Sequence, residues 1–380
     1  MARDIDKRLK SLRERRTGAD RIADLALDSA TQVIAKSMTL ESYAKRAPVQ
    51  KHTQYALGAM QAVDPDYTRI SLEEADRVKD QLKRGLDRRS ISTEFRLQGS
   101  VACDIHIRGV SDVDLLVLDG RYIHYESNGQ KALLGGYTSP VTWNTLQALI
   151  QLRSESESIL DAAFPAAKVK KDGAKAIKIS GGSLRRPVDV VPSNWFDTVD
   201  YQRSSNEVDR GVQILNKNVP ERVLNTPFKH IKQINDQDQR SLGGLKKAIR
   251  LCKNVKADAE SDGTKIELSS YDIASALWHA DMAALTTVGI ANELAILAEA
   301  TRFLDELARR PNHARTLRVP DDSRYVFDTE AKIEGLRLLS LEMDDLSERV
   351  AREQSKSPWL WQTPSTEPVY EELRKAYVPG

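Results

Sequence analysis

The chain has 380 residues, 40% of them hydrophobic and 29% charged, and its formal net charge at pH 7 is only +2. This length allows two or three domains or lobes with a sizeable core, and the balance of 57 basic and 55 acidic residues does not favour long nucleic acid as a partner. The sequence shows no bilayer-spanning stretch, no secretory signal and only two cysteines, which predicts a cytoplasmic protein without membrane attachment or a disulfide framework.

The first part of the chain, residues 1–70, is predicted to be an N-terminal helical arm that Pro65 interrupts. A clearer helix is expected to open at Ser71, because Ser71 and Glu74 have the Ser-x-x-Glu spacing of a capping box. This helix leads to a predicted strand at residues 94–98. The arm's apolar stripe is irregular and consists of Leu9, Leu12, Ile22, Leu25, Leu27 and Val33.

A Gly-Ser turn and two acids follow that strand. Gly99 lets the backbone approach a ligand closely, and Ser100 offers a hydroxyl and an N–H to phosphate. Asp112 and Asp114 begin an apolar strand that runs to Leu118, and side chains two residues apart share one face of a strand. Two adjacent carboxylates repel each other unless a cation lies between them, which predicts a Mg²⁺ site.

The third acid, Asp189, lies in the valine-rich strand 187–192. The segment before it alternates around an Asp-Gly turn at Asp172, which predicts a hairpin, and another hairpin is expected near residues 211–215. Three carboxylates could hold two divalent ions and clamp both oxygens of a phosphoryl displacement, with Asp189 placed to take the acceptor's proton.

The remainder of the chain is predicted to be helical, with helices near residues 241–256, 270–284, 289–309 and 329–353. In the first of them Lys246, Arg250 and Lys253 fall on one face, and the opposite side is expected to be buried. The members of that buried side are Leu242, Leu245, Ile249 and Cys252. We therefore predict an α+β fold, divided into the arm 1–70, a catalytic core 71–227, a helical C-lobe 228–355 and a tail 356–380.

The order of a Gly-Ser turn, an Asp-x-Asp strand and a lone later Asp resembles the DNA polymerase β-like nucleotidyltransferases. The longer run from Gly99 to Leu116 is similar to one branch, the bacterial cGAS/DncV-like nucleotidyltransferases. Residues 248–253 resemble that family's spine-helix segment, and residues 269–271 resemble its serine-tyrosine element. The resemblance covers the chain from about residue 71 to residue 285.

The resemblance implies a bilobal enzyme with a polymerase β-like core, two Mg²⁺ or Mn²⁺ ions, and ATP, GTP or pyrimidine triphosphates as substrates. Its product would be a cyclic di- or trinucleotide second messenger for anti-phage defence. Lys253 and Ser270 would hold phosphate, and Tyr271 would stack on a base. An operon-encoded conjugating or regulatory protein would act at the C-terminus, which ends at Gly380.

The chain departs from the family pattern at Asp104-Ile105, where the family commonly has Gly-Thr. This difference bears on substrate preference and rate more than on reaction class. Two alternatives remain open from the residues alone. One is a transferase that modifies RNA, a protein or a small molecule, and the other is a catalytically silent nucleotide-binding protein.

Overall fold

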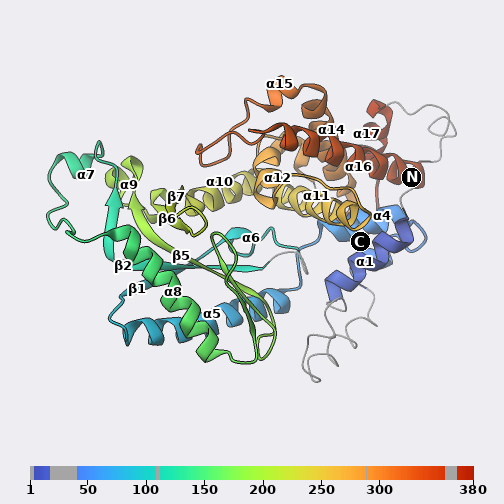
Figure 1. Ribbon diagram of the computed structural model, residues 1–380. Coiled ribbons are helices and arrows are strands. Elements are labelled where there is room, and N and C mark those ends of the chain that lie inside the picture. The colour runs from blue at the N-terminus through green and yellow to red at the C-terminus, as the bar shows by residue number, and fades with distance from the viewer. Residues whose placement is uncertain (1–3, 18–40, 108–111, 288, 356–365) are drawn as a thin grey trace. The chain divides into compact units, whose positions relative to one another are not determined.

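The computed structural model describes residues 4–17, 41–107, 112–287, 289–355 and 366–380 (Figure 1). They form two compact units, each described here by itself. The sheet unit comprises Asp64–Cys103 and Ser111–Lys232, and the helical unit comprises Met1–Val63, Asp104–Val110 and Gln233–Gly380. The division differs from the expected one, because the N-terminal segment belongs to the same unit as the C-terminal helices.

One mixed sheet forms the centre of the sheet unit. Its strand order is β1-β2-β5-β4-β3, with β6 paired to β5 and β7 paired to β6. Among the described strands, the β2–β5 pairing alone is parallel, and the other neighbours are antiparallel. The strands are β1 (Thr93–Gln98), β2 (Val113–Tyr125), β3 (Lys168–Lys170), β4 (Ile177–Ser180), β5 (Val188–Asp197), β6 (Gly211–Asn216) and β7 (Glu221–Asn225).

The two faces of this sheet have different cores. Helices α5 (Pro65–Asp87) and α8 (Thr145–Ala163) cover one face, where their leucines pack on β2 residues such as Leu115 and Val117. Leu116 and Leu118, on the opposite face, pack with Trp195 and with the valines and isoleucines of β5 and β6. Asp114 alternates with Leu115 along β2, so it lies on the second face, away from α5 and α8. The shorter helices are α6 (Gly99–Ala102), α7 (Gln130–Leu133), α9 (Val199–Ser204) and η2 (Glu207–Asp209).

The helical unit packs the N-terminal helices against C-terminal ones. Helix α4 contacts α1, α11 and α16, while α14, α16 and α17 contact one another. Its elements are α1 (Ile5–Thr17), α3 (Ser42–Arg46), α4 (Lys51–Met60), α11 (Gly244–Ser261), α12 (Ser270–Leu277), α13 (Met282–Leu285), η3 (Ile290–Asn292), α14 (Leu294–Arg309), α15 (Pro311–Ala314), α16 (Glu330–Gln354) and α17 (Thr366–Lys375). Helix α10 (Pro227–Arg240) spans the boundary between the two units. None of the described helices combines the length and apolar character that a membrane span requires.

The structure corrects three predictions about helices. Helix α5 begins at Pro65 rather than at Ser71, because Asp64 caps it and proline suits the first helical position. The expected helix 270–284 is two helices, α12 and α13, and Asp281 caps the second. Leu242 is 73% exposed instead of buried, because it precedes α11 with a φ of 50°.

The other helix predictions hold approximately, and both predicted hairpins are confirmed as β3–β4 and β6–β7. Four residues of the expected N-terminal stripe lie outside the described residues, namely Ile22, Leu25, Leu27 and Val33.

Candidate functional site

Two of the predicted acids lie side by side in the sheet. Asp114 near the start of β2 and Asp189 near the start of β5 are register partners in the parallel pair. Register partners lie about 5 Å apart and point to the same face of a sheet. The carboxylates therefore share the sheet face that α5 and α8 do not cover.

Gly99 lies directly against this pair. Its φ is +75°, and a Cβ added to it would overlap the Asp114 carboxylate. Gln98, the residue before it, is the β1 register partner of Asp114, which explains why the turn meets the acid. Ser100 follows as the second residue of the short helix α6 and is half-buried. The structure thus brings the predicted Gly-Ser turn together with the predicted acids.

The remaining predicted acid, Asp112, forms an ion pair with a lysine. Lys178 of β4 forms an ion pair with the Asp112 Oδ2 atom, and the Lys178 backbone is the register partner of Asp189. Sequence reasoning missed Lys178, although its alternation with the buried Ile177 and Ile179 places it on the acids' face. Across the described residues, no three acidic, histidine or cysteine side chains are gathered in an arrangement that could hold a metal ion as it stands. Lys178 holds one oxygen of the Asp112 carboxylate in an ion pair.

Among the three acids, Asp189 has a carboxyl group with a raised pKa. Burial raises the pKa of its carboxyl to about 6 and the charge of Asp112 adds to this effect, while Lys178 opposes it. Its Oδ1 atom is buried without a hydrogen-bond partner. A buried carboxylate with a raised pKa and an unsatisfied oxygen is typical of a site that binds a cation or a proton.

The remaining predicted residues lie in the helical unit. Lys253 of α11 is 3% exposed, and its Nζ donates to the Ile105 carbonyl oxygen over 2.8 Å. On the preceding turn, Arg250 donates to the carbonyl oxygens of Met60 and Asp104. Arg250 and Lys253 therefore bind the backbone at Asp104-Ile105, where the sequence differs from the family pattern.

The serine-tyrosine element opens helix α12. Ser269 is its N-cap and forms a reciprocal capping box with Asp272, so the exposed Ser270 is free of the capping role. The Arg324 guanidinium lies 5.2 Å from the centre of the Tyr271 ring. Burial raises the pKa of the Tyr271 hydroxyl, and the nearby Asp321 adds to the effect.

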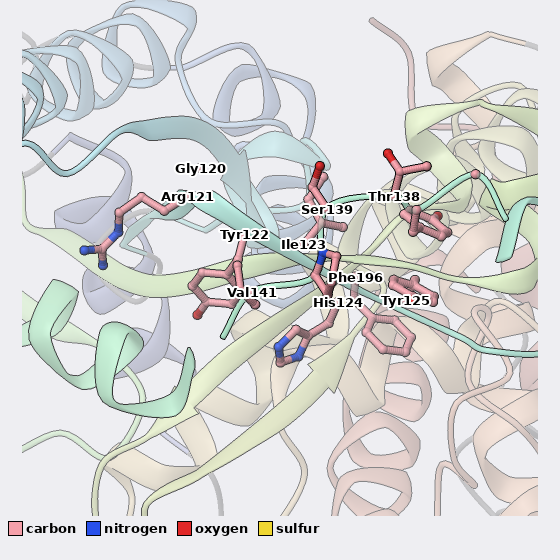
Figure 2. A pocket seen from close by; sticks show the side chains of 13 residues that line it. Gly120, Arg121, Tyr122, Ile123, His124, Tyr125, Thr138, Ser139, Val141 and Phe196 are labelled. Carbon is pink, nitrogen blue, oxygen red and sulfur yellow. The ribbon is translucent and has the colours of Figure 1, made fainter. Parts of the chain in front are cut away.

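A hollow of about 680 Å³ lies beside the second half of β2, lined by Gly120–Tyr125, residues 136–141 and Phe196 (Figure 2). Figure 2 shows the Arg121 guanidinium turned away from the rings of Tyr125 and Phe196, and that guanidinium pairs with Asp119 at 2.7 Å. This hollow contains none of the predicted site residues and offers no uncommitted cation to a triphosphate.

Comparisons with known proteins identify the family. Residues 232–344 match the family model of the cGAS/DncV-like nucleotidyltransferase C-terminal helical domain. The chain is 44% identical over 302 residues to the cyclic dinucleotide synthase CdnE of Yersinia aleksiciae, covering 79% of this chain and 77% of that protein. The chain belongs to the cGAS/DncV-like nucleotidyltransferases.

Other members of the family extend the match. A c-di-GMP synthase of Capnocytophaga granulosa is 32% identical over 318 residues, which is 76% of this chain and 85% of that protein. The solved structure of a STING-associated CdnE c-di-GMP synthase from Flavobacteriaceae sp. has a TM-score of 0.73 at 21% identity and covers 93% of this chain and all of that one. The family and fold expected from the motifs are thus confirmed, and this cGAS/DncV-like chain is a nucleotidyltransferase.

Proposed function

We propose that this nucleotidyltransferase is a metal-dependent cyclic dinucleotide synthase whose acids are Asp112, Asp114 and Asp189. The observation that carries the proposal is the register pairing of Asp114 with Asp189 beside the Gly99 turn. Relatives named cyclic dinucleotide synthase and c-di-GMP synthase support the product class. A cyclic trinucleotide, the other ring size that the motifs allow, has no such support among these names.

The residues fit divalent ions. Carboxylate oxygens are the ligands that Mg²⁺ and Mn²⁺ prefer, and the unpartnered Oδ1 atom of Asp189 faces the same cluster as the Asp112 charge. Two such ions, when bound, would neutralise the donor triphosphate and lower the pKa of the acceptor hydroxyl.

The chain's own residues would then take distinct parts. Asp189 would accept the hydroxyl proton, since its pKa of about 6 in the metal-free protein is already close to neutrality. Gly99 and Ser100 would hold the donor phosphates through a backbone that carries no side chain at residue 99. Lys253 and Ser270 would contact phosphate and Tyr271 would stack on a base, as the family resemblance implies.

GTP is the substrate to test first, because three of the relatives are named c-di-GMP synthases. The purified full-length protein is incubated with α-³²P-labelled GTP or ATP and Mg²⁺ or Mn²⁺, and the products are treated with phosphatase and identified by mass spectrometry. We expect a phosphatase-resistant cyclic dinucleotide that disappears in an Asp112→Ala/Asp114→Ala variant. Asp87→Ala is the control, because Asp87 is exposed on α5 and pairs with Lys83 on its own helix.

Two results would contradict the proposal. Label that appears only in linear products, or on added RNA or protein, would point to another transferase reaction. A double aspartate variant as active as the wild type would remove the proposed metal ligands.

We also propose that the C-terminus contacts an operon-encoded conjugating or regulatory protein. The exposed Gly380 ends a segment that is held at Val378, whose N–H donates to the Ala291 carbonyl, and Arg46 donates to the carbonyls of Val378 and Pro379. A partner would therefore have to release this segment before using it. Deletion of Gly380 in a strain that carries the whole operon is expected to abolish conjugates, and unchanged conjugates would contradict the idea.

A further inference from the structure

A row of polar residues crosses the sheet through the two paired acids. The register places Gln98, Asp114, Asp189, Lys178 and Lys170 opposite one another on β1, β2, β5, β4 and β3. All five side chains therefore point to the same face, at steps of about 4.8 Å from strand to strand. Lys178 is the member of the row that places a cation beside the acids.

Lys178 reaches past its register partner to Asp112. The ion pair joins its Nζ to the Asp112 Oδ2 atom, and the side chains are 40% and 14% exposed respectively. The Asp112 carboxylate is thus mostly covered, with an ammonium group on one of its two oxygens. The lysine remains partly in water, so it can leave without crossing the core.

An ammonium and a divalent ion compete for the same carboxylate oxygens. Both need the anion's lone pairs, and their like charges repel strongly at ion-pair distance. A partly exposed ion pair contributes little to stability. A metal ion can therefore displace Lys178 at a small cost in free energy. That cost still lowers the affinity for the metal by a measurable factor.

We propose that Lys178 is a positioning residue that acts as the counter-cation of Asp112 until a divalent ion displaces it. It holds Asp112 beside Asp189 in the metal-free protein and raises the metal concentration at which the site fills. The inference rests on the proposed function, since it takes Asp112 to be a metal ligand.

The test is a direct Mn²⁺ titration of the nucleotide-free, full-length protein, followed by electron paramagnetic resonance of the free ion. Lys178→Met is expected to bind Mn²⁺ about three- to fivefold more tightly than the wild type, because no ammonium has to be displaced. Lys178→Arg should stay within twofold of the wild type, since the cation is kept. Lys168→Met is the matched control, because Lys168 lies on β3, is exposed and removes the same charge away from the row.

Equal or weaker Mn²⁺ affinity in Lys178→Met, with Lys168→Met unchanged, would overturn the inference. Lys178→Gln serves as a second variant in case the methionine disturbs folding, and melting curves establish that each variant is folded. If the wild type binds no Mn²⁺ more tightly than Asp112→Ala/Asp114→Ala does, the metal site of the proposed function itself fails. If the wild type binds Mn²⁺ and both neutral variants match it, only the role of Lys178 fails.

Discussion

Gly99 has two separate reasons to be glycine, and a substitution can separate them. Its φ of +75° strains any residue with a Cβ, and that Cβ would also overlap the Asp114 carboxylate. Gly99→Ala is therefore expected to lose at least tenfold in nucleotidyl transfer, because Asp114 has to move. The strain alone should cost about 1–2 kcal/mol of stability.

Gly135→Ala is the matched control for this change. Gly135 has a similar φ of +70°, but an added Cβ would meet nothing within 4 Å. It should lose similar stability in urea unfolding and keep its activity. Equal activity in the two variants would show that Asp114 does not depend on the turn.

Asp189 gives the protein a pH dependence of known sign. Its pKa of about 6 lies above the ordinary 3.8, so the folded chain binds this proton more readily than the unfolded chain. The contribution is complete below about pH 4, and stability falls as the pH rises through 6. In EDTA, Asp189→Asn should be more stable than the wild type by on the order of 3 kcal/mol at pH 8. The two should unfold alike at pH 4, and a pH-independent difference in urea midpoint would contradict this origin.

At the scale of single residues, the sequence predicts the sheet face of a side chain wherever strand alternation determines it. Alternation along β2 and β5 predicts the sheet face of Asp114 and Asp189, whereas their convergence with Asp112 is what the family resemblance implies. Lys178 could not be found in this way, since its contact with Asp112 depends on which strands are neighbours. The burial of Lys253 against the Ile105 carbonyl has the same cause, because it joins segments 148 residues apart.

Helix α5 shows how a local signal can be assigned to the wrong place. Ser71 and Glu74 have the spacing of a capping box, yet Ser71 lies inside the helix, where its hydroxyl donates to the Tyr67 carbonyl. The real cap is Asp64, which accepts from the Asp66 N–H at 2.8 Å. A proline often interrupts a helix, but Pro65 occupies the first helical position of this one.

Substitution of the two candidate caps distinguishes these assignments. Asp64→Ala should cost about 1 kcal/mol, the usual value of an N-cap. Ser71→Ala should cost less than about 0.5 kcal/mol, because it removes a hydroxyl that bonds only within its own helix. Urea unfolding followed by circular dichroism measures both, and a larger loss for Ser71→Ala would restore the original prediction.

Hairpins are better predicted than helix ends because their signal is contained in a few residues. The turn after Lys170 and the strands on either side of it are adjacent in sequence. The alternation of apolar and polar residues is therefore enough to predict the β3–β4 hairpin. The pairing of β2 with β5, by contrast, is parallel and joins residues 75 positions apart, as in Asp114 and Asp189. No local pattern encodes such a pairing.

At the scale of the whole molecule, the N-terminal segment is part of the helical unit rather than a separate arm. Arg15 of α1 donates to both oxygens of Asp258 on α11, at 2.6 and 2.8 Å. The Tyr55 hydroxyl of α4 donates to the same carboxylate at 2.6 Å. All three side chains are buried, so one carboxylate joins the N-terminal helices α1 and α4 to α11.

Removing that carboxylate should therefore lower the free energy of unfolding of the protein by more than the loss of one surface contact would. Asp258→Ala removes the carboxylate from the buried Arg15 guanidinium and Tyr55 hydroxyl, and breaking a buried ion pair in this way typically costs about 3–5 kcal/mol. Glu260→Ala is the control two residues away, where a partly exposed pair with Lys256 contributes at most about 0.5 kcal/mol. Urea unfolding compares the two, and equal losses would mean that α1 is not held by this network. The predicted difference follows from burial and from the number of donors, because both acids lie on α11 but Asp258 is buried and accepts from Arg15 and Tyr55, whereas Glu260 is exposed and pairs with Lys256.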